Sequence, residues 1–199
     1  MTPFMYPRAA LVRRHGPVGY LDTSSFRPWL RDEFGFRCVY CLRRERWEPD
    51  LGVFEIDHHL SVSRAPQLVT EYTNLLYSCT ACNAAKQNQI VSDPAIVFLS
   101  TNLLVETDGR MSPQTREARL LVQQLDLNDP MFVTWRMRMI RIVALAREHD
   151  SALFRSLMAY PDDLPDLAIL RPPGGNTRPE GIVDSYFERR KRDELPDTS

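Results

Sequence analysis

The sequence lacks the features that mark a membrane or exported protein. No apolar run approaches the roughly 18 residues that cross a bilayer as a helix, and the N-terminal residues have no basic-then-apolar signal pattern. Apolar residues make up 43% and charged residues 26% of the 199 residues, which is typical of a globular protein with a real core. We therefore expect a cytoplasmic protein without membrane contact.

Lysine is scarce as well. Lys86 and Lys191 are the only lysines, so arginine carries nearly all of the positive charge, and the formal net charge of −1 excludes a uniformly basic surface for nucleic acid. Two stretches are nevertheless locally basic. One covers residues 37–46, and the other covers residues 131–147 and contains no acid. For the second stretch, a solvated helix face and a phosphate-binding surface both remain open.

The chain has only four cysteines, and they form two Cys-x-x-Cys pairs. In a reducing cytoplasm such pairs favour a metal site over disulfides. Four thiolates suit a tetrahedral Zn²⁺ and leave no position for water, so we predict a closed structural site. Its ligands would be Cys38, Cys41, Cys79 and Cys82, and the ion would clamp the two ends of the segment between the pairs.

That segment contains residues of a different chemistry. Residues 53–56 are predicted to form a strand that ends at Asp57 and His58. A carboxylate is a common ligand of Mg²⁺, and a histidine, with an ordinary pKa of about 6.5, can take a proton from water near neutral pH. A second apolar run at residues 75–77 and a helix start at Cys82 complete a ββα pattern.

These residues carry a resemblance to a known family. Cys-x-x-Cys, then Ile-Asp-His, then Asn-Leu-Leu-Tyr-Ser-Cys-x-x-Cys-Asn-x-x-Lys resembles the zinc-containing branch of the HNH endonucleases, whose fold is the ββα-metal fold. The close match covers about residues 36–88, and residues 93–128 are loosely similar to the helical extension of bacterial members. The implied fold class is α+β, with a small ββα nuclease module clamped by zinc and followed by a mainly α-helical extension.

The resemblance also implies a role for each polar residue. His58 would be the general base that activates water, and Asn74 would orient the loop and the base by hydrogen bonds. Asp57 and Asn83 would hold a catalytic Mg²⁺ or Mn²⁺. Because Asn83 stands where many members have histidine, the preference of this site for Zn²⁺ or Ni²⁺ should weaken. The implied reaction is the hydrolysis of DNA phosphodiester bonds, which leaves 5′-phosphate and 3′-hydroxyl ends.

Several neighbouring residues leave alternatives open. His59 is a rival of His58 as the base, although we expect it to point into the module or toward the rim of the DNA. Glu55 lies on the same strand face as Asp57, as an outer-shell partner or as a solvated residue. Lys86 could reach a phosphate or a loop carbonyl, or remain a solvated helix residue. The residues expected to contact nucleic acid are Lys86, Arg43, Arg44 and Arg46.

The chain is predicted to divide into four regions. They are an N-terminal segment at 1–35, the nuclease module at 36–92, a helical extension at 93–170, and a flexible charged tail at 171–199. In the N-terminal segment, a short helix is expected over 26–34, with Ser24 and Ser25 as its cap. In the extension, helices are expected from Ser112-Pro113, from Asn128-Asp129-Pro130 to about Glu148, and over 151–160. A short helix is expected near 186–193. Trp29, Trp47 and Trp135 are expected in the core.

Two functions of other classes also remain open. One is a zinc-stabilised nucleic-acid-binding module without catalysis. The other is a protein–protein interaction through the helical half, with the nuclease as its effector. The expected partners are DNA, with RNA as the second candidate, a second copy of the chain, and a partner protein of a defence system. The expected setting is a restriction system, another defence system or a mobile element.

Overall fold

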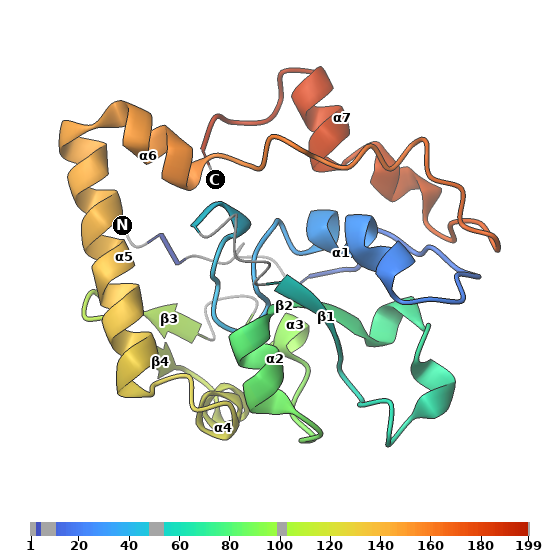
Figure 1. The fold of residues 1–199 in the computed structure, drawn as a ribbon, viewed down its shortest axis with the longest axis horizontal. Coiled ribbons are helices and arrows are strands. Elements are labelled where there is room, and N and C mark those ends of the chain that lie inside the picture. The colour runs from blue at the N-terminus through green and yellow to red at the C-terminus, as the bar shows by residue number, and fades with distance from the viewer. Residues whose placement is uncertain (1–2, 5–10, 48–53, 99–102, 199) are drawn as a thin grey trace.

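The computed structural model describes residues 3–4, 11–47, 54–98 and 103–198 and has an α+β fold. At its centre, strands β1 (Phe54–His58) and β2 (Leu75–Cys79) pair antiparallel, and helix α2 (Thr80–Lys86) follows directly (Figure 1). Phe54 pairs with Cys79, and His58 pairs with Leu75. The predicted fold class, with a ββα module and a helical extension, is confirmed. Val53, predicted as the first strand residue, lies outside the described residues.

The connection between the two strands is long and contains two short 3-10 helices, η4 (Pro66–Leu68) and η5 (Tyr72–Asn74). Strand β2 is buried along its whole length because it contacts helix α1 (Arg27–Glu33) as well as β1 and α2. Helix α2 ends at Lys86, because the φ of 48° at Gln87 lies outside the right-handed helical region. The module is therefore a small hairpin backed by one short helix on each side.

The N-terminal segment packs on this module as predicted. The 3-10 helix η1 (Ser24–Phe26) leads into α1, and Trp29 on α1 is fully buried. The predicted hydroxyl cap is wrong, however. The Asp22 carboxylate accepts hydrogen bonds from the hydroxyls of Ser24 and Ser25 and from the backbone N–H of Ser25. An acidic side chain therefore closes the turn, because it can accept several bonds at once.

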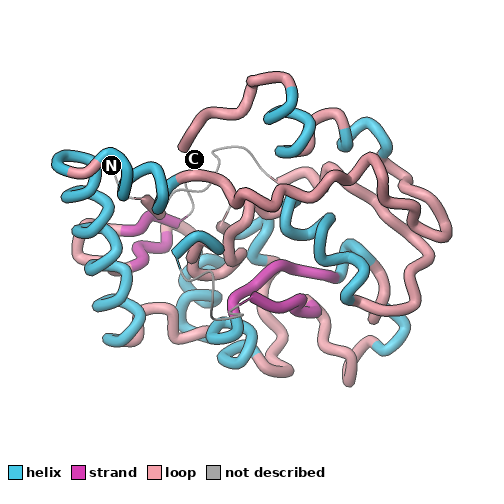
Figure 2. Tube along the Cα trace, turned by 45° about the horizontal axis from the view of Figure 1, so that its top comes forward, coloured by secondary structure: helices cyan, strands magenta, loops and turns pink. Residues whose placement is uncertain are grey.

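The extension contains a second hairpin that the sequence did not predict. Its strands β3 (Leu103–Val105) and β4 (Met111–Pro113) lie apart from the first hairpin (Figure 2). The helix expected from Ser112-Pro113 begins later, as α4 (Arg116–Gln124), where the Thr115 hydroxyl accepts a bond from the Ala118 N–H. A short helix α3 (Pro94–Val97) precedes the hairpin. Strands of three residues are too short to show a periodicity of their own.

Two helices form the outer edge of the extension (Figure 1). Helix α5 (Pro130–His149) begins as predicted, with the Asp129 side chain accepting from the Met131 N–H, and α6 (Ser151–Met158) packs beside it. On α5, Val143 and Ala146 are buried, whereas Ile142 is 42% exposed. Among the described residues, no helix combines the length and apolarity needed to cross a bilayer.

The C-terminal region differs from the flexible tail that the sequence predicts. Gly174 donates its N–H to the carbonyl of Val18 at 2.9 Å, and Val18 donates its own N–H to Gly175 at 3.0 Å. After the 3-10 helix η6 (Pro179–Ile182), helix α7 (Tyr186–Lys191) begins with the Tyr186 N–H bonded to Asp32 of α1 at 2.8 Å. Glycine at position 19 permits this pairing, because a Cβ there would clash with the backbone nitrogen of Gly174.

The three tryptophans belong to the core, as predicted. Trp29 is fully buried, whereas Trp47 and Trp135 are partly buried against the central cluster with their ring centroids 5.6 Å apart. Trp47 belongs to the 3-10 helix η2 (Glu45–Trp47), which follows the first cysteine pair. The Trp47–Trp135 contact therefore attaches helix α5 to the ββα module.

Candidate active site and metal centre

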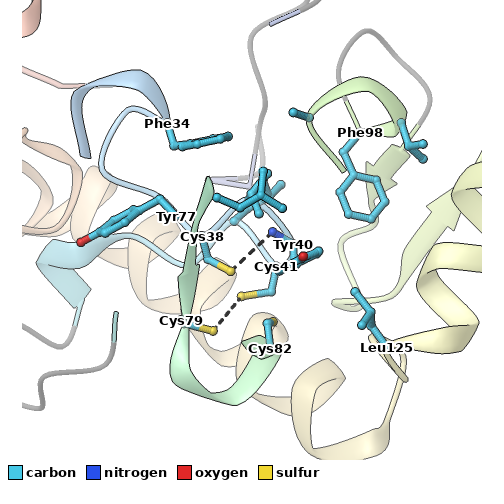
Figure 3. Packing of buried hydrophobic residues seen from close by; sticks show 14 of the residues in the cluster. Phe34, Cys38, Tyr40, Cys41, Tyr77, Cys79, Cys82, Phe98 and Leu125 are labelled. Carbon is cyan, nitrogen blue, oxygen red and sulfur yellow. Dashed lines mark hydrogen bonds between the residues drawn. The ribbon is translucent and has the colours of Figure 1, made fainter. Parts of the chain in front are cut away.

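The four cysteines converge on one point (Figure 3). Cys38 and Cys41 lie in a turn before β1, Cys79 ends β2, and Cys82 lies in the first turn of α2. Their sulfurs all lie within 4.8 Å of one another, and the Sγ atoms of Cys41 and Cys79 are 3.7 Å apart. Bonds of about 2.3 Å in a tetrahedral zinc site imply sulfurs about 3.8 Å apart. The cluster therefore fits a structural Zn²⁺.

The burial of these thiols also favours a bound cation. Burial raises the pKa of the Cys38 thiol well above its usual range, and the neighbouring thiols, first of all Cys38, raise the pKa of Cys82. Four thiolates in one buried cluster would repel one another without a positive charge between them. A bound Zn²⁺ supplies that charge and keeps the ligands deprotonated.

His58 lies at the end of β1 and is partly exposed. Its Nε2 is 3.0 Å from the carbonyl oxygen of Val69 in the connection between the strands. A carbonyl oxygen only accepts hydrogen bonds, so Nε2 carries the proton and Nδ1 of the neutral ring carries a lone pair. Nδ1 has no hydrogen-bond partner within the described part of the chain. The ring is therefore oriented as a base that can accept a proton at Nδ1.

His59 differs from His58. Its backbone N–H donates to the carbonyl of Asn74 at 2.8 Å, which fixes the backbone after the strand. Its ring Nδ1 is buried without a hydrogen-bond partner, so no bond of that atom orients the ring. Both histidines are partly exposed, and among the described residues His58 is the one whose ring nitrogen forms a hydrogen bond.

Asn74 is buried directly before β2 and ties the connecting loop together. Its Oδ1 accepts from the Leu60 N–H at 2.8 Å, and its Nδ2 donates to the carbonyls of Leu60 and Leu68 at 3.1 and 3.2 Å. One amide side chain therefore satisfies three backbone groups. Since Val69 follows Leu68 directly, Asn74 also fixes the carbonyl that contacts His58.

Asp57 is only 4% exposed, and both of its carboxylate oxygens have partners. Lys86 donates to Oδ1 at 2.9 Å, and the Tyr40 hydroxyl donates to Oδ2 at 2.6 Å. Burial, followed by the charge of Asp57, raises the pKa of Tyr40 well above its usual range, so this hydroxyl stays a donor. Asp57 thereby joins the turn of Cys38 and Cys41, which contains Tyr40, to helix α2.

Lys86 is fully buried, so it is not the solvated residue considered above. Besides Asp57, its ammonium contacts the backbone carbonyl of His58 at 2.6 Å, which is one of the contacts the sequence suggests. A single cation therefore holds both residues at the end of β1. The expected phosphate contact would require this ion pair to open.

Asn83 lies one turn before Lys86 on the same face of α2. Its Nδ2 donates to Oε2 of Glu55 at 2.7 Å, and both residues are partly exposed. The predicted metal ligands Asp57 and Asn83 thus have different partners. The Asn83 amide oxygen fits a hard divalent cation. The Asp57 carboxylate could bind such a cation only if its hydrogen bond with Lys86 or with Tyr40 opened.

The arginines expected to bind nucleic acid are engaged within the chain. Arg43 lies over the ring of Trp135 at 4.4 Å, and Arg46 forms an ion pair with Asp162 at 2.7 Å. Arg44 is 5% exposed, and burial, followed by the charge of Arg37, lowers its pKa to about 9. These three side chains hold the first cysteine turn against the C-terminal half of the chain.

Arg136, from the second basic stretch, is fully buried as well. It donates to the carbonyls of Gly109 and Leu127, each at 2.6 Å. It therefore ties α5 to the turn between β3 and β4 and to the end of α4. Arg136 therefore belongs neither to a solvated helix face nor to a phosphate-binding surface, the two alternatives that the sequence left open for this stretch.

Sequence reasoning did not find Tyr40 or the partner of Glu55. Tyr40 has no signal beyond its place between two cysteines. Glu55 and Asp57 are two residues apart on a strand, and Asn83 and Lys86 are three residues apart on a helix. Those spacings put each pair on one face, so two polar contacts between β1 and α2 could have been anticipated.

Comparison with known proteins gives a family match for the ββα module. Residues 38–89 match the family model described as HNH endonuclease, a range that starts at the first zinc cysteine and ends just beyond α2. The segment is thus an HNH endonuclease domain, in a variant whose four clustered cysteines fit a zinc ion, and the resemblance seen in the sequence is confirmed. The family suggests nuclease activity and binding to nucleic acid. Comparison with curated proteins gives no match.

Proposed function

We propose that the protein is a metal-dependent HNH endonuclease that hydrolyses phosphodiester bonds of DNA. The observation that carries this proposal is the state of the His58 ring. Its Nε2 lies 3.0 Å from the Val69 carbonyl oxygen, which assigns the proton to Nε2 and leaves a lone pair on Nδ1 of this partly exposed residue. A general base needs such an acceptor atom on the solvent side.

In this reaction His58 takes a proton from water at Nδ1 while the water oxygen attacks phosphorus. The bond to the 3′ oxygen breaks and this oxygen takes a proton from solvent water, which leaves 5′-phosphate and 3′-hydroxyl ends. As the ring becomes positively charged, the hydrogen bond from Nε2 to the Val69 carbonyl grows stronger. Asn74 holds the loop that supplies this carbonyl, and it thereby keeps the ring in place.

Asp57 and Asn83 would hold the catalytic Mg²⁺ or Mn²⁺. When bound, the ion would polarise the scissile phosphate and neutralise developing charge. The partly exposed amide of Asn83 supports this role, and an oxygen donor set favours Mg²⁺ or Mn²⁺ over softer metals. Asp57 could contribute after its hydrogen bond with Lys86 or Tyr40 opens.

Plasmid nicking in the presence of Mg²⁺ or Mn²⁺ tests the proposal. We expect the wild type to nick DNA and the His58→Ala variant to nick it about 10²–10⁴-fold more slowly. His59→Ala is the matched control, since it removes the neighbouring imidazole, and it should retain most of the activity. Full activity in His58→Ala together with loss in His59→Ala would transfer the role of base to His59.

One observation favours a second candidate, a zinc-stabilised nucleic-acid-binding module without catalysis. The Lys86 ammonium pairs with the buried Asp57 carboxylate, which would keep a divalent cation away from that residue. Gel retardation combined with the nicking assay separates the two candidates. Retardation of DNA without cleavage in any divalent metal would support the binding module.

A further inference from the structure

Glu55 and Asn83 face each other across the contact between β1 and α2. Nδ2 of Asn83 donates to Oε2 of Glu55 at 2.7 Å, although the two residues are 28 positions apart in the sequence. Glu55 is the second residue of β1, where it pairs with Ser78 of β2. Both side chains are partly exposed. The contact thus joins two secondary-structure elements at the surface of the module.

This hydrogen bond determines which end of the Asn83 amide faces which way. An ionised carboxylate can only accept, and an amide has one donating and one accepting end. If the amide were turned over, its oxygen would lie against Oε2 of Glu55 and the two would repel. Glu55 therefore holds the nitrogen of Asn83 toward itself and turns Oδ1 away.

The other polar pair on this face leaves Asn83 as the accessible oxygen donor. Lys86 and Asp57 are both buried, and they satisfy each other. Oδ1 of Asn83, in contrast, accepts no hydrogen bond from any described residue, and the side chain is partly exposed. An oriented amide oxygen without a partner is suited to bind a hard cation.

We propose that Glu55 is a positioning residue, which orients the Asn83 amide so that its Oδ1 can bind the divalent cation. This role rests on the proposed function and adds a residue to it. Glu55 acts through Asn83 and does not itself contact the metal. Partners of metal ligands commonly contribute about 10–100-fold to metal affinity.

The test is the affinity of the zinc-loaded full-length protein for Mn²⁺, measured by the electron paramagnetic resonance of free Mn²⁺. We expect Glu55→Ala to weaken binding about 10–100-fold, while the zinc content and the melting temperature stay at wild-type values. Glu55→Gln is the matched variant, because its side-chain oxygen can still accept from Asn83, and it should retain most of the affinity. Glu55→Val is a second removal variant that suits a strand.

A double-mutant cycle shows whether Glu55 acts through Asn83. In an Asn83→Ala background, the further change Glu55→Ala should leave Mn²⁺ affinity unchanged. Additive losses, with Glu55→Gln as weak as Glu55→Ala, would make Glu55 a direct ligand and overturn the proposal. Wild-type affinity in both Glu55→Ala and Glu55→Val would overturn it as well.

Failure of the proposed function gives a different result. A wild type that neither binds Mn²⁺ nor cleaves DNA would remove the endonuclease proposal and the role of Glu55 together. A wild type that does both, with Mn²⁺ binding unaffected by the loss of Glu55, would remove only the role of Glu55. The His58→Ala variant is a further control, since it should bind Mn²⁺ without cleaving.

Discussion

The cysteine cluster that fits zinc (the clamp) and the proposed reaction centre (Asp57, His58, Asn74 and Asn83) adjoin each other, yet they are held together in different ways. The clamp has four ligands of one kind, all buried around one point. The reaction centre has an acid, an imidazole and two amides, and each side chain has its own hydrogen-bond partner. A Zn²⁺ shared by all four thiolates would make the clamp all-or-none, whereas separate hydrogen bonds of about 1 kcal/mol each can be lost singly.

The largest effect is expected from Cys38→Ser in the clamp. Structural zinc sites contribute about 10–16 kcal/mol to folding in zinc-finger peptides, which is comparable to the whole stability of a domain. We expect this variant to lose zinc and to unfold, as measured by metal content and circular dichroism. His58→Ala is the comparison, and it should stay folded with its zinc. If the two variants behave alike, the distinction between clamp and reaction centre is wrong.

Lys86→Met should have the next largest effect, because it leaves the Asp57 carboxylate buried without its counter-ion. Removing one partner of a buried ion pair costs about 3–5 kcal/mol, so the midpoint of urea unfolding should fall. The control is the double variant Lys86→Met with Asp57→Asn, which removes both charges and should recover part of the loss. Equal stability of the wild type and Lys86→Met would show that this ion pair is open in solution.

Asn74→Ala should be less destabilising, since no charge is left unpaired. It leaves buried backbone groups of the loop unsatisfied, at a cost of about 1–3 kcal/mol each. Because the same loop carries Val69, we also expect DNA cleavage to fall. Thermal unfolding and nicking should be measured together, with Asn74→Asp as the control that keeps the acceptor for the Leu60 N–H. A stable and fully active alanine variant would remove Asn74 from the reaction centre.

The smallest effect concerns alkaline pH. Burial, followed by the charge of Glu33, raises the pKa of Tyr72 well above its ordinary value of 10.0, and its hydroxyl donates to Glu33 at 3.0 Å. As the pH rises above about 10, the unfolded chain loses this proton and the folded chain keeps it, so stability falls by up to about 1.4 kcal/mol per pH unit for this group.

Tyr72→Phe should therefore flatten the fall in unfolding free energy between about pH 10 and 11. Tyr20→Phe is the matched control, since Tyr20 contacts the same Phe26 ring as Tyr72. Slopes rather than absolute stabilities are compared, because losing a hydrogen bond shifts the whole curve. Equal slopes for the wild type and Tyr72→Phe would show that the Tyr72 proton is not held by the folded state.

The parts that the sequence predicted are those encoded over a few residues. The two cysteine pairs, the strand that ends at His58, and the start of α5 at Asp129-Pro130 all depend on local spacing or capping. Each needs only neighbouring residues to be recognised. The β3–β4 hairpin was missed because its strands have three residues each, and the packed C-terminal region was missed because its polar composition resembles that of a free tail.

The sequence by itself therefore determined the ββα module, the four cysteines that fit zinc and the kinds of residue at the proposed reaction centre. Only the tertiary structure decided which charges are paired inside the molecule. The Lys86–Asp57 ion pair joins residues 29 positions apart, and Arg136 reaches Gly109 across 27 positions. The partner of a buried charge depends on which distant segments pack together, because burial makes an unpaired charge costly and selects whichever partner the fold brings near.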